Sequence, residues 1–153
     1  MFDHVTDETI GVLIRSFYGK VRRDPQLGPI FQEAIGTNWD NHISKMCDFW
    51  GAAMRISRRY SGDMLTAHRR VKGIQPALFG RWLDLFEQTV TEHFAGTAGA
   101  ALCDRARKTA HNLQLALFYR RDARPAAAAV TGANSSAHAS DAMVAPIMPE
   151  RRA

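Results

Sequence analysis

The spacing of apolar residues is the feature of this sequence that most restricts the possible folds. Over residues 7–23 the large apolar side chains recur every three or four positions, which is the period of one face of an α-helix. No segment alternates apolar and polar residues as a half-buried strand would. The helical period returns in four later segments, residues 38–59, 64–71, 76–95 and 100–121. The sequence therefore predicts an all-α fold of five or six helices of unequal length.

Proline and glycine separate the predicted helices. Asp24-Pro25 and Gly28-Pro29 end the first helix, because proline lacks a backbone N–H and restricts the residue before it. A short segment carrying Ile30 and Phe31 follows. The later breaks are Ser61-Gly62-Asp63, then Gly73 ahead of a helix that starts at Pro76, and finally a turn at Gly96 and Gly99.

Two of the helix starts carry capping residues. Thr6 is the predicted N-cap of the first helix, since a threonine hydroxyl can accept a hydrogen bond from an unpaired N–H of the first turn. Thr37 and Asp40 have the spacing of a weak capping pair at the start of the second long helix.

The composition of the chain changes after about Arg124. Residues 125–153 are rich in Ala, Ser, Gly and Pro and contain no aromatic residue, so they bury too little apolar surface to offset their conformational entropy. We predict one folded domain over residues 1–124 and a disordered, low-complexity tail over residues 125–153. A chain of 153 residues is long enough for one such domain to enclose a small ligand.

Several classes of protein are excluded by composition. No run approaches the roughly 18 apolar residues of a membrane span, and the polar, acidic N-terminus is unlike a secretion signal, so we expect a cytoplasmic protein without a membrane partner. Cys47 and Cys103 form no C-x-x-C pair, and we expect buried, reduced thiols. The net charge of +5 comes from scattered Lys and Arg residues without a nucleic-acid-binding motif, so no nucleic-acid partner is expected.

Four side chains are candidates for chemistry. Tyr18, His42 and Trp82 each share a helix face with large apolar residues, so each buries a group that needs a hydrogen-bond partner. Ordinary structural bonds would satisfy them; alternatively, they converge as donors in an apolar chamber, the usual form of a small-ligand site. His68, on the short predicted helix, is either a packed histidine or an axial ligand to iron. These residues alone leave both interpretations open.

A family resemblance favours the second interpretation. The segments FYGKVRRDPQLGPIF (17–31), NWDNHISKMCDFW (38–50), Tyr60, TAHRRV (66–71) and FGRWLDLF (79–86) resemble the group III truncated haemoglobins over about residues 5–120. The order and spacing carry the resemblance: His42 follows Tyr18 by 24 residues, His68 follows by 26 more, and Trp82 by another 14. The chain also contains no Gly-Gly pair, unlike the other truncated groups.

The resemblance implies a shortened globin fold around haem b, with His68 as the proximal iron ligand. It implies Tyr18 and Trp82 as distal hydrogen-bond donors and His42 as the distal histidine, which gates entry or contacts the ligand. The residues implied to line the haem are Phe17, Phe31, Met46, Phe49, Leu65 and Phe79, and those implied to bind its propionates are Lys45, Tyr60, Arg69 and Lys72.

We expect reversible binding of O2, and of other diatomics such as NO or CO, with slow O2 release. Such a site suits NO oxidation or peroxide reduction with an external reductase, although the sequence leaves open whether the protein is an enzyme. The alternatives are a non-enzymatic gas sensor or scavenger, and a haem-free helical interaction protein. With no long exposed apolar stripe in the sequence, we expect a monomer.

Overall fold

The structure is a computed structural model that describes residues 1–119, so the predicted tail at 125–153 and the last residues of the predicted domain lie outside the described residues. The described part is helical and contains no strand, only an isolated bridge between Phe2 and Phe94, which confirms the all-α prediction. Within it, no helix is long and apolar enough to cross a membrane. The elements are α1 Asp7–Arg23, α2 Leu27–Ile35, α3 Trp39–Ala53, α4 Met64–Arg69, α5 Pro76–His93, α6 Gly96–Gln114 and a π-helical turn, η1, Leu115–Tyr119.

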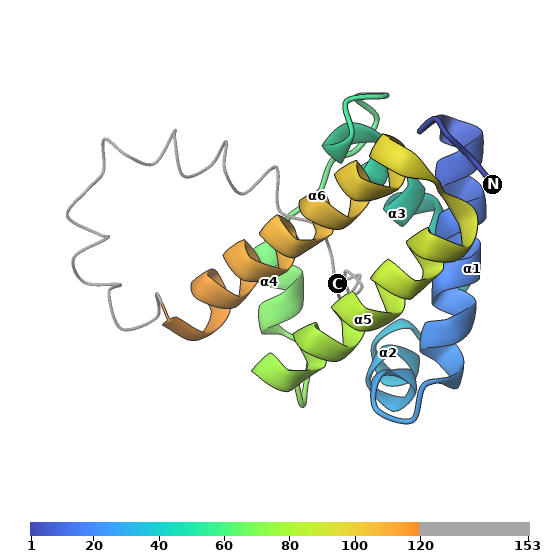
Figure 1. The fold of residues 1–153 in the computed structure, drawn as a ribbon. Helices are drawn as coiled ribbons and strands as arrows, with labels where there is room; N and C mark the ends of the chain where they lie inside the picture. Colours follow the sequence, from blue (N-terminus) through green and yellow to red (C-terminus); the bar gives the residue numbers. More distant parts are fainter. Residues whose placement is uncertain (120–153) are drawn as a thin grey trace.

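Helix α1 is the centre of the fold. It packs against α2, α3 and α5, while α5 and α6 form an antiparallel pair joined by a short turn (Figure 1). The predicted N-cap is confirmed: the Thr6 hydroxyl accepts from the Thr9 N–H, and the Thr9 hydroxyl accepts from the Thr6 N–H. The apolar face of α1 is fully buried among its three neighbours, so the helix holds its side chains in fixed positions.

Helix α3 is shorter than the sequence indicates, because it ends at Ala53 rather than at residue 59. Arg55 adopts a left-handed backbone conformation (φ 61°), the Arg55 N–H donates to the Ala52 carbonyl and the Ile56 N–H donates to the Gly51 carbonyl. These two bonds form a Schellman motif, which satisfies the last carbonyl groups of a helix. The usual residue at this position is glycine, so an arginine there gives no signal in the sequence.

Two helix starts also differ from the predictions. Helix α3 has Asn38 as its N-cap, without a side-chain hydrogen bond, so the predicted capping pair of Thr37 and Asp40 is wrong. Helix α6 starts at Gly96, and Gly99 lies inside it rather than in a turn. A Cβ atom on Gly99 would meet Phe94 at 3.4 Å, so this glycine permits close approach of α6 to the end of α5.

The short segment with Ile30 and Phe31 is the regular helix α2, which begins at Leu27. Gly28 and Pro29 therefore lie in its first turn, so the predicted break at these two residues is wrong and only Asp24-Pro25 ends α1. The first turn of α2 is capped by the Asp24 carboxylate, which accepts from the N–H groups of Gln26 and Leu27. The predicted starts of the next helices are confirmed: α4 begins after Asp63, whose side chain accepts from the Thr66 N–H, and Pro76 is the first residue of α5.

Candidate functional site

The phenol ring of Tyr18 lies at the centre of a cluster of aromatic rings. It is 1% exposed, and the His42 ring meets it edge-on with 4.9 Å between centroids. The rings of Phe31 and Trp39 lie 5.9 and 6.1 Å from it. These neighbours come from α2 and α3, so the cluster joins three helices around one phenol. Burial raises the pKa of Tyr18 far above its usual range, which keeps the hydroxyl protonated and able to donate.

Trp82 reaches the same cluster from α5. Its side chain is fully buried, stacks on Phe86 at 5.1 Å and meets Phe17 edge-on at 5.3 Å. The indole N–H lies close enough to the Tyr18 oxygen to offset part of the rise in the phenol pKa. It is not in hydrogen-bonding geometry with any group in residues 1–119. A buried N–H without a partner is costly, by about 1–3 kcal/mol, and indicates a position at which a ligand atom can accept.

Like the Trp82 indole N–H, the Nε2 atom of His42 is buried and has no hydrogen-bond partner in the described residues. Burial, with smaller contributions from the charges of His68 and Lys45, lowers the pKa of His42 to about 3. The imidazole is therefore neutral near pH 7.

His68 is fully buried on the short helix α4, and its Nδ1 lies 2.5 Å from the Met64 carbonyl oxygen. A carbonyl can only accept, so the proton of the neutral ring is on Nδ1 and the lone pair is on Nε2. Burial lowers the pKa of His68 to about 4, which keeps the ring neutral. A neutral imidazole oriented by a backbone carbonyl is the usual form of a histidine that binds a metal.

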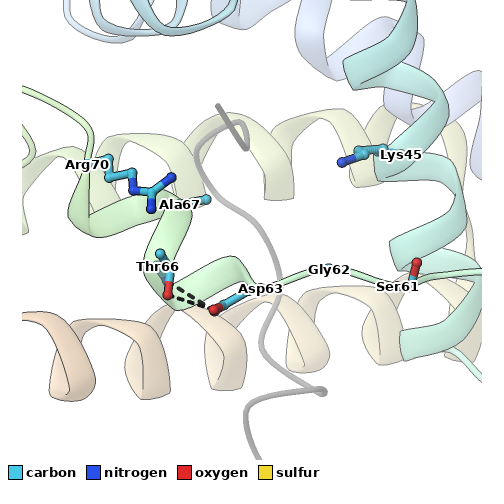
Figure 2. Close-up of a pocket in the computed structure, with 7 residues that line it drawn as sticks. All are labelled: Lys45, Ser61, Gly62, Asp63, Thr66, Ala67 and Arg70. Carbon is cyan, nitrogen blue, oxygen red and sulfur yellow. Dashed lines mark hydrogen bonds between the residues drawn. The ribbon is translucent and has the colours of Figure 1, made fainter. Parts of the chain in front are cut away.

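A cavity of about 340 Å³ lies between α3, α4 and the segment that joins them (Figure 2). Lys45 of α3 and Ala67 of α4 line it, whereas His42 and His68 are not among the described residues that do. Lys45 and Arg70 extend toward it from α3 and α4, on opposite sides. The described residues that line it are Lys45, Ser61, Gly62, Asp63, Thr66, Ala67 and Arg70. The volume is in the range of small-molecule sites, and its charged lining side chains are two cations, Lys45 and Arg70, and one carboxylate, Asp63.

The structure brings together most of the residues that the sequence singled out. Phe17, Phe31, Met46, Phe49 and Phe79 are buried in the core that surrounds the three distal side chains, and Leu65 is half-buried on α4. Tyr60 is half-buried against Phe49, with 5.2 Å between ring centroids.

The propionate contacts expected of Arg69 and Lys72, both exposed, stay predictions. Arg70, which the sequence analysis did not select, is also exposed and lines the cavity. The signal was helical spacing, because Arg70 follows Thr66 by four residues and shares its side of α4. Cys47 and Cys103 are free thiols as expected, but they are half-buried rather than buried.

Within residues 1–119, no group of three or more His, Cys, Asp or Glu side chains could hold a metal ion. A metal bound by His68 would therefore need a cofactor that supplies its other ligands. Iron in a porphyrin has this property, since one protein imidazole is enough to hold it. The donor set, the neutral His68 tautomer and the two buried atoms without partners all fit haem.

Comparison with known proteins adds independent findings. The chain is 32% identical over 120 residues to the curated Group 3 truncated hemoglobin ctb of Campylobacter jejuni, in an alignment that covers 76% of this chain and 94% of that protein. It also overlaps the crystal structure of a group III truncated hemoglobin from Campylobacter jejuni with a TM-score of 0.73 and 32% identity, over 77% of this chain and 95% of that one. No protein-family model matches the chain. The overlap confirms the fold expected from the sequence.

Proposed function

Because the chain belongs to the group 3 truncated haemoglobins, we propose that it holds a b-type haem through His68 and reversibly binds a diatomic gas, O2 or NO, beside Tyr18, His42 and Trp82. The observation that carries this proposal is the geometry of His68, whose Nδ1–H is fixed on the Met64 carbonyl. Haem held there would supply a ferrous iron with one open coordination position.

The residues on the other side of the site determine how firmly the gas is held. The Tyr18 phenol is protonated, and the Trp82 indole N–H has no partner in the described residues, so both can donate to an oxygen atom of the ligand. In a dry pocket each such bond contributes on the order of 1–3 kcal/mol. At about 1.4 kcal/mol per tenfold change, two such bonds, about 2–6 kcal/mol together, would slow O2 release by about thirtyfold to over ten-thousandfold.

Slow release suits chemistry on the bound gas better than delivery of it. We propose oxidation of NO or reduction of peroxide as the reaction class, with electrons from an external reductase. We propose Lys45, Tyr60, Arg69 and Lys72 as candidates for binding the haem propionates and add Arg70, which lines the cavity between α3 and α4 together with Lys45. We propose that the protein acts as a monomer in the cytoplasm, because the exposed large apolar side chains of the described residues are few and lie far apart in sequence, at Met1, Val12, Ile56 and Tyr119.

Absorption spectroscopy tests the proposal. Hemin added to the purified protein should give a Soret band that shifts on reduction and again on addition of CO. His68→Ala should lose the hemin during gel filtration, and added imidazole should restore retention by replacing the missing ligand. His111→Ala, on the exposed face of α6, is the matched control and should behave like the wild type. A wild-type protein that stays colourless with hemin would instead be a helical interaction protein.

A further inference from the structure

Asp24 is a buried carboxylate that the proposed function does not use. Its side chain is 1% exposed. One carboxylate oxygen, Oδ2, accepts from the backbone N–H groups of Gln26 at 3.0 Å and Leu27 at 2.9 Å. The other, Oδ1, lies 2.8 Å from Nε and 2.5 Å from Nη2 of Arg81. Both oxygens of one carboxylate are therefore occupied, each by two donors.

These four bonds join three helices at one point. Asp24 is the C-cap of α1, its Oδ2 caps the start of α2, and Arg81 belongs to α5. The chain is tightly packed here, since a Cβ atom on Gly28 would meet the Arg22 carbonyl oxygen at 2.9 Å. The turn between α1 and α2 is therefore closely packed, and the Arg81 side chain binds α5 to it through Asp24.

The negative charge of Asp24 favours a cation, Arg81, as its partner at this contact between α1, α2 and α5, which is called the junction below. Burial alone would raise the pKa of Asp24, but the hydrogen bonds from Arg81 and from the Leu27 and Gln26 N–H groups hold it below its usual range. The carboxylate is therefore ionised near pH 7. A buried ionised carboxylate that loses its partner is strongly destabilised, and paired donors of one guanidinium restrict both distance and angle.

The junction lies close in sequence to both distal donors. Arg81 directly precedes Trp82 on α5, and Asp24 follows Tyr18 by six residues along α1 and its cap. The indole and the phenol therefore come from the two long helices that Asp24 and Arg81 connect. A shift of about 0.5 Å between α1 and α5 is enough to degrade the geometry of a site built from both.

We propose that the Asp24–Arg81 pair is a positioning element: it fixes the Trp82 indole N–H relative to the Tyr18 phenol and so sets how strongly both bond to the ligand. This role rests on the proposed function. Neither residue touches the ligand site, and both act through Trp82.

A second ion pair provides the matched control. Lys20 and Glu92 also join α1 to α5, with 2.6 Å between Nζ and Oε2, but Glu92 lies ten residues after Trp82 and the pair is more exposed. Glu92→Gln removes an α1–α5 ion pair without touching the junction at Asp24.

The following variants distinguish the effect of the Asp24–Arg81 ion pair from the effect of Asp24 as the cap of α2. Asp24→Asn keeps an oxygen that can accept from Gln26 and Leu27 but loses the charge that binds Arg81. Arg81→Gln leaves the cap of α2 untouched, and the Arg81 side chain is 40% exposed, so this variant should fold. Arg81→Lys keeps the charge and should recover part of the wild-type behaviour.

The first measurement uses the ferrous protein with CO, whose C–O stretching band reports hydrogen bonding to the ligand. Asp24→Asn and Arg81→Gln should shift or split this band and speed O2 release by roughly three- to tenfold, which corresponds to about 1 kcal/mol. Glu92→Gln should leave both unchanged. A wild-type band and O2 release rate in both junction variants, even with reduced stability, would show that the pair only stabilises the fold.

The second measurement needs no haem. In the hemin-free protein, the NMR signal of the Trp82 indole N–H, assigned with Trp82→Phe, should move or double in Asp24→Asn and Arg81→Gln but not in Glu92→Gln. An unmoved signal would overturn the positioning role alone. A wild-type protein that fails to bind hemin overturns the proposed function, and this inference with it.

Discussion

The two sides of the site are supported very differently. The distal side chains Tyr18, His42 and Trp82 are on helices of 17, 15 and 18 residues that pack on one another through a continuous apolar core. His68 is on the six-residue helix α4, which follows the exposed residues 61–63 and packs mainly against η1. In Figure 1, α4 lies away from α1, toward the end of α6.

The difference shows which half of the site is organised in advance. A helix of six residues is not stable by its own hydrogen bonds, and segments with few buried contacts open more readily than the core. The distal side chains are therefore held in place by the core, whereas the helix that carries His68, the proposed iron ligand, has less support of its own. Four predictions test this comparison.

The largest effect is expected on stability. Phe17→Ala should lower the free energy of unfolding by about 3–5 kcal/mol, because this buried ring contacts those of Tyr18, Trp82 and Phe86. Leu65→Ala, at a half-buried position on α4, should cost less than half as much. Urea unfolding of the hemin-free proteins measures both values. Equal losses would show that the two sides are equally well packed.

The next effect concerns ligand release. Tyr18→Phe combined with Trp82→Phe removes both distal donors and should speed O2 dissociation by about tenfold or more. Each single variant should give an intermediate rate. Stopped-flow displacement of O2 by CO measures the rates, with His111→Ala, on the exposed face of α6, as the control that keeps the wild-type rate. Unchanged O2 release in the double variant would mean that the two groups do not bond to the ligand.

A pH dependence follows from His42. The unfolded chain takes up a proton on this residue near pH 6.5, whereas burial lowers the pKa in the fold to about 3. The unfolded state thus binds more protons between these values, so the stability is complete above pH 6.5 and falls as the pH drops. From pH 6.5 to 4, His42 should account for a loss on the order of 2–3 kcal/mol.

His42→Leu removes this titration and should flatten the curve of unfolding free energy against pH in the hemin-free protein. The remaining histidines and carboxylates titrate in both proteins, so the difference between the two curves isolates His42. Parallel curves would show that the His42 ring is solvated in the fold.

The smallest effect is expected at the cavity rim. Lys45→Met and Arg70→Met should each speed hemin loss to apomyoglobin by a few-fold, since ion pairs at partly exposed positions contribute about 0–1 kcal/mol. The effect should shrink at high salt, because screening weakens such pairs. Arg69→Met, next along α4 but outside the lining residues, should leave the rate unchanged. A larger effect from Arg69 than from Arg70 would assign the propionate contact to Arg69 instead.

Much of the fold was predictable because its signals are local. Thr6 caps α1, Pro76 starts α5, and the apolar period identifies the buried face of every long helix. The order and spacing also selected Tyr18, His42 and Trp82, which the fold brings into one cluster of aromatic rings. The end of α3 was missed because Arg55, and not a glycine, takes the left-handed conformation there. The place of Arg70 beside the cavity was not predicted, although its spacing of four residues from Thr66 puts both on one side of α4.

The sequence by itself determined the helical class of this protein, most breaks between its helices and the side chains that are candidates for the site. The helices and their breaks depend on neighbours only a few residues apart. Only the tertiary structure decided which nitrogen of His68 carries the proton, which buried donors remain without a partner, and that Asp24 meets Arg81 across 57 residues of chain. Hydrogen bonds and burial depend on where distant segments meet in space, and the linear spacing of residues does not contain that distance.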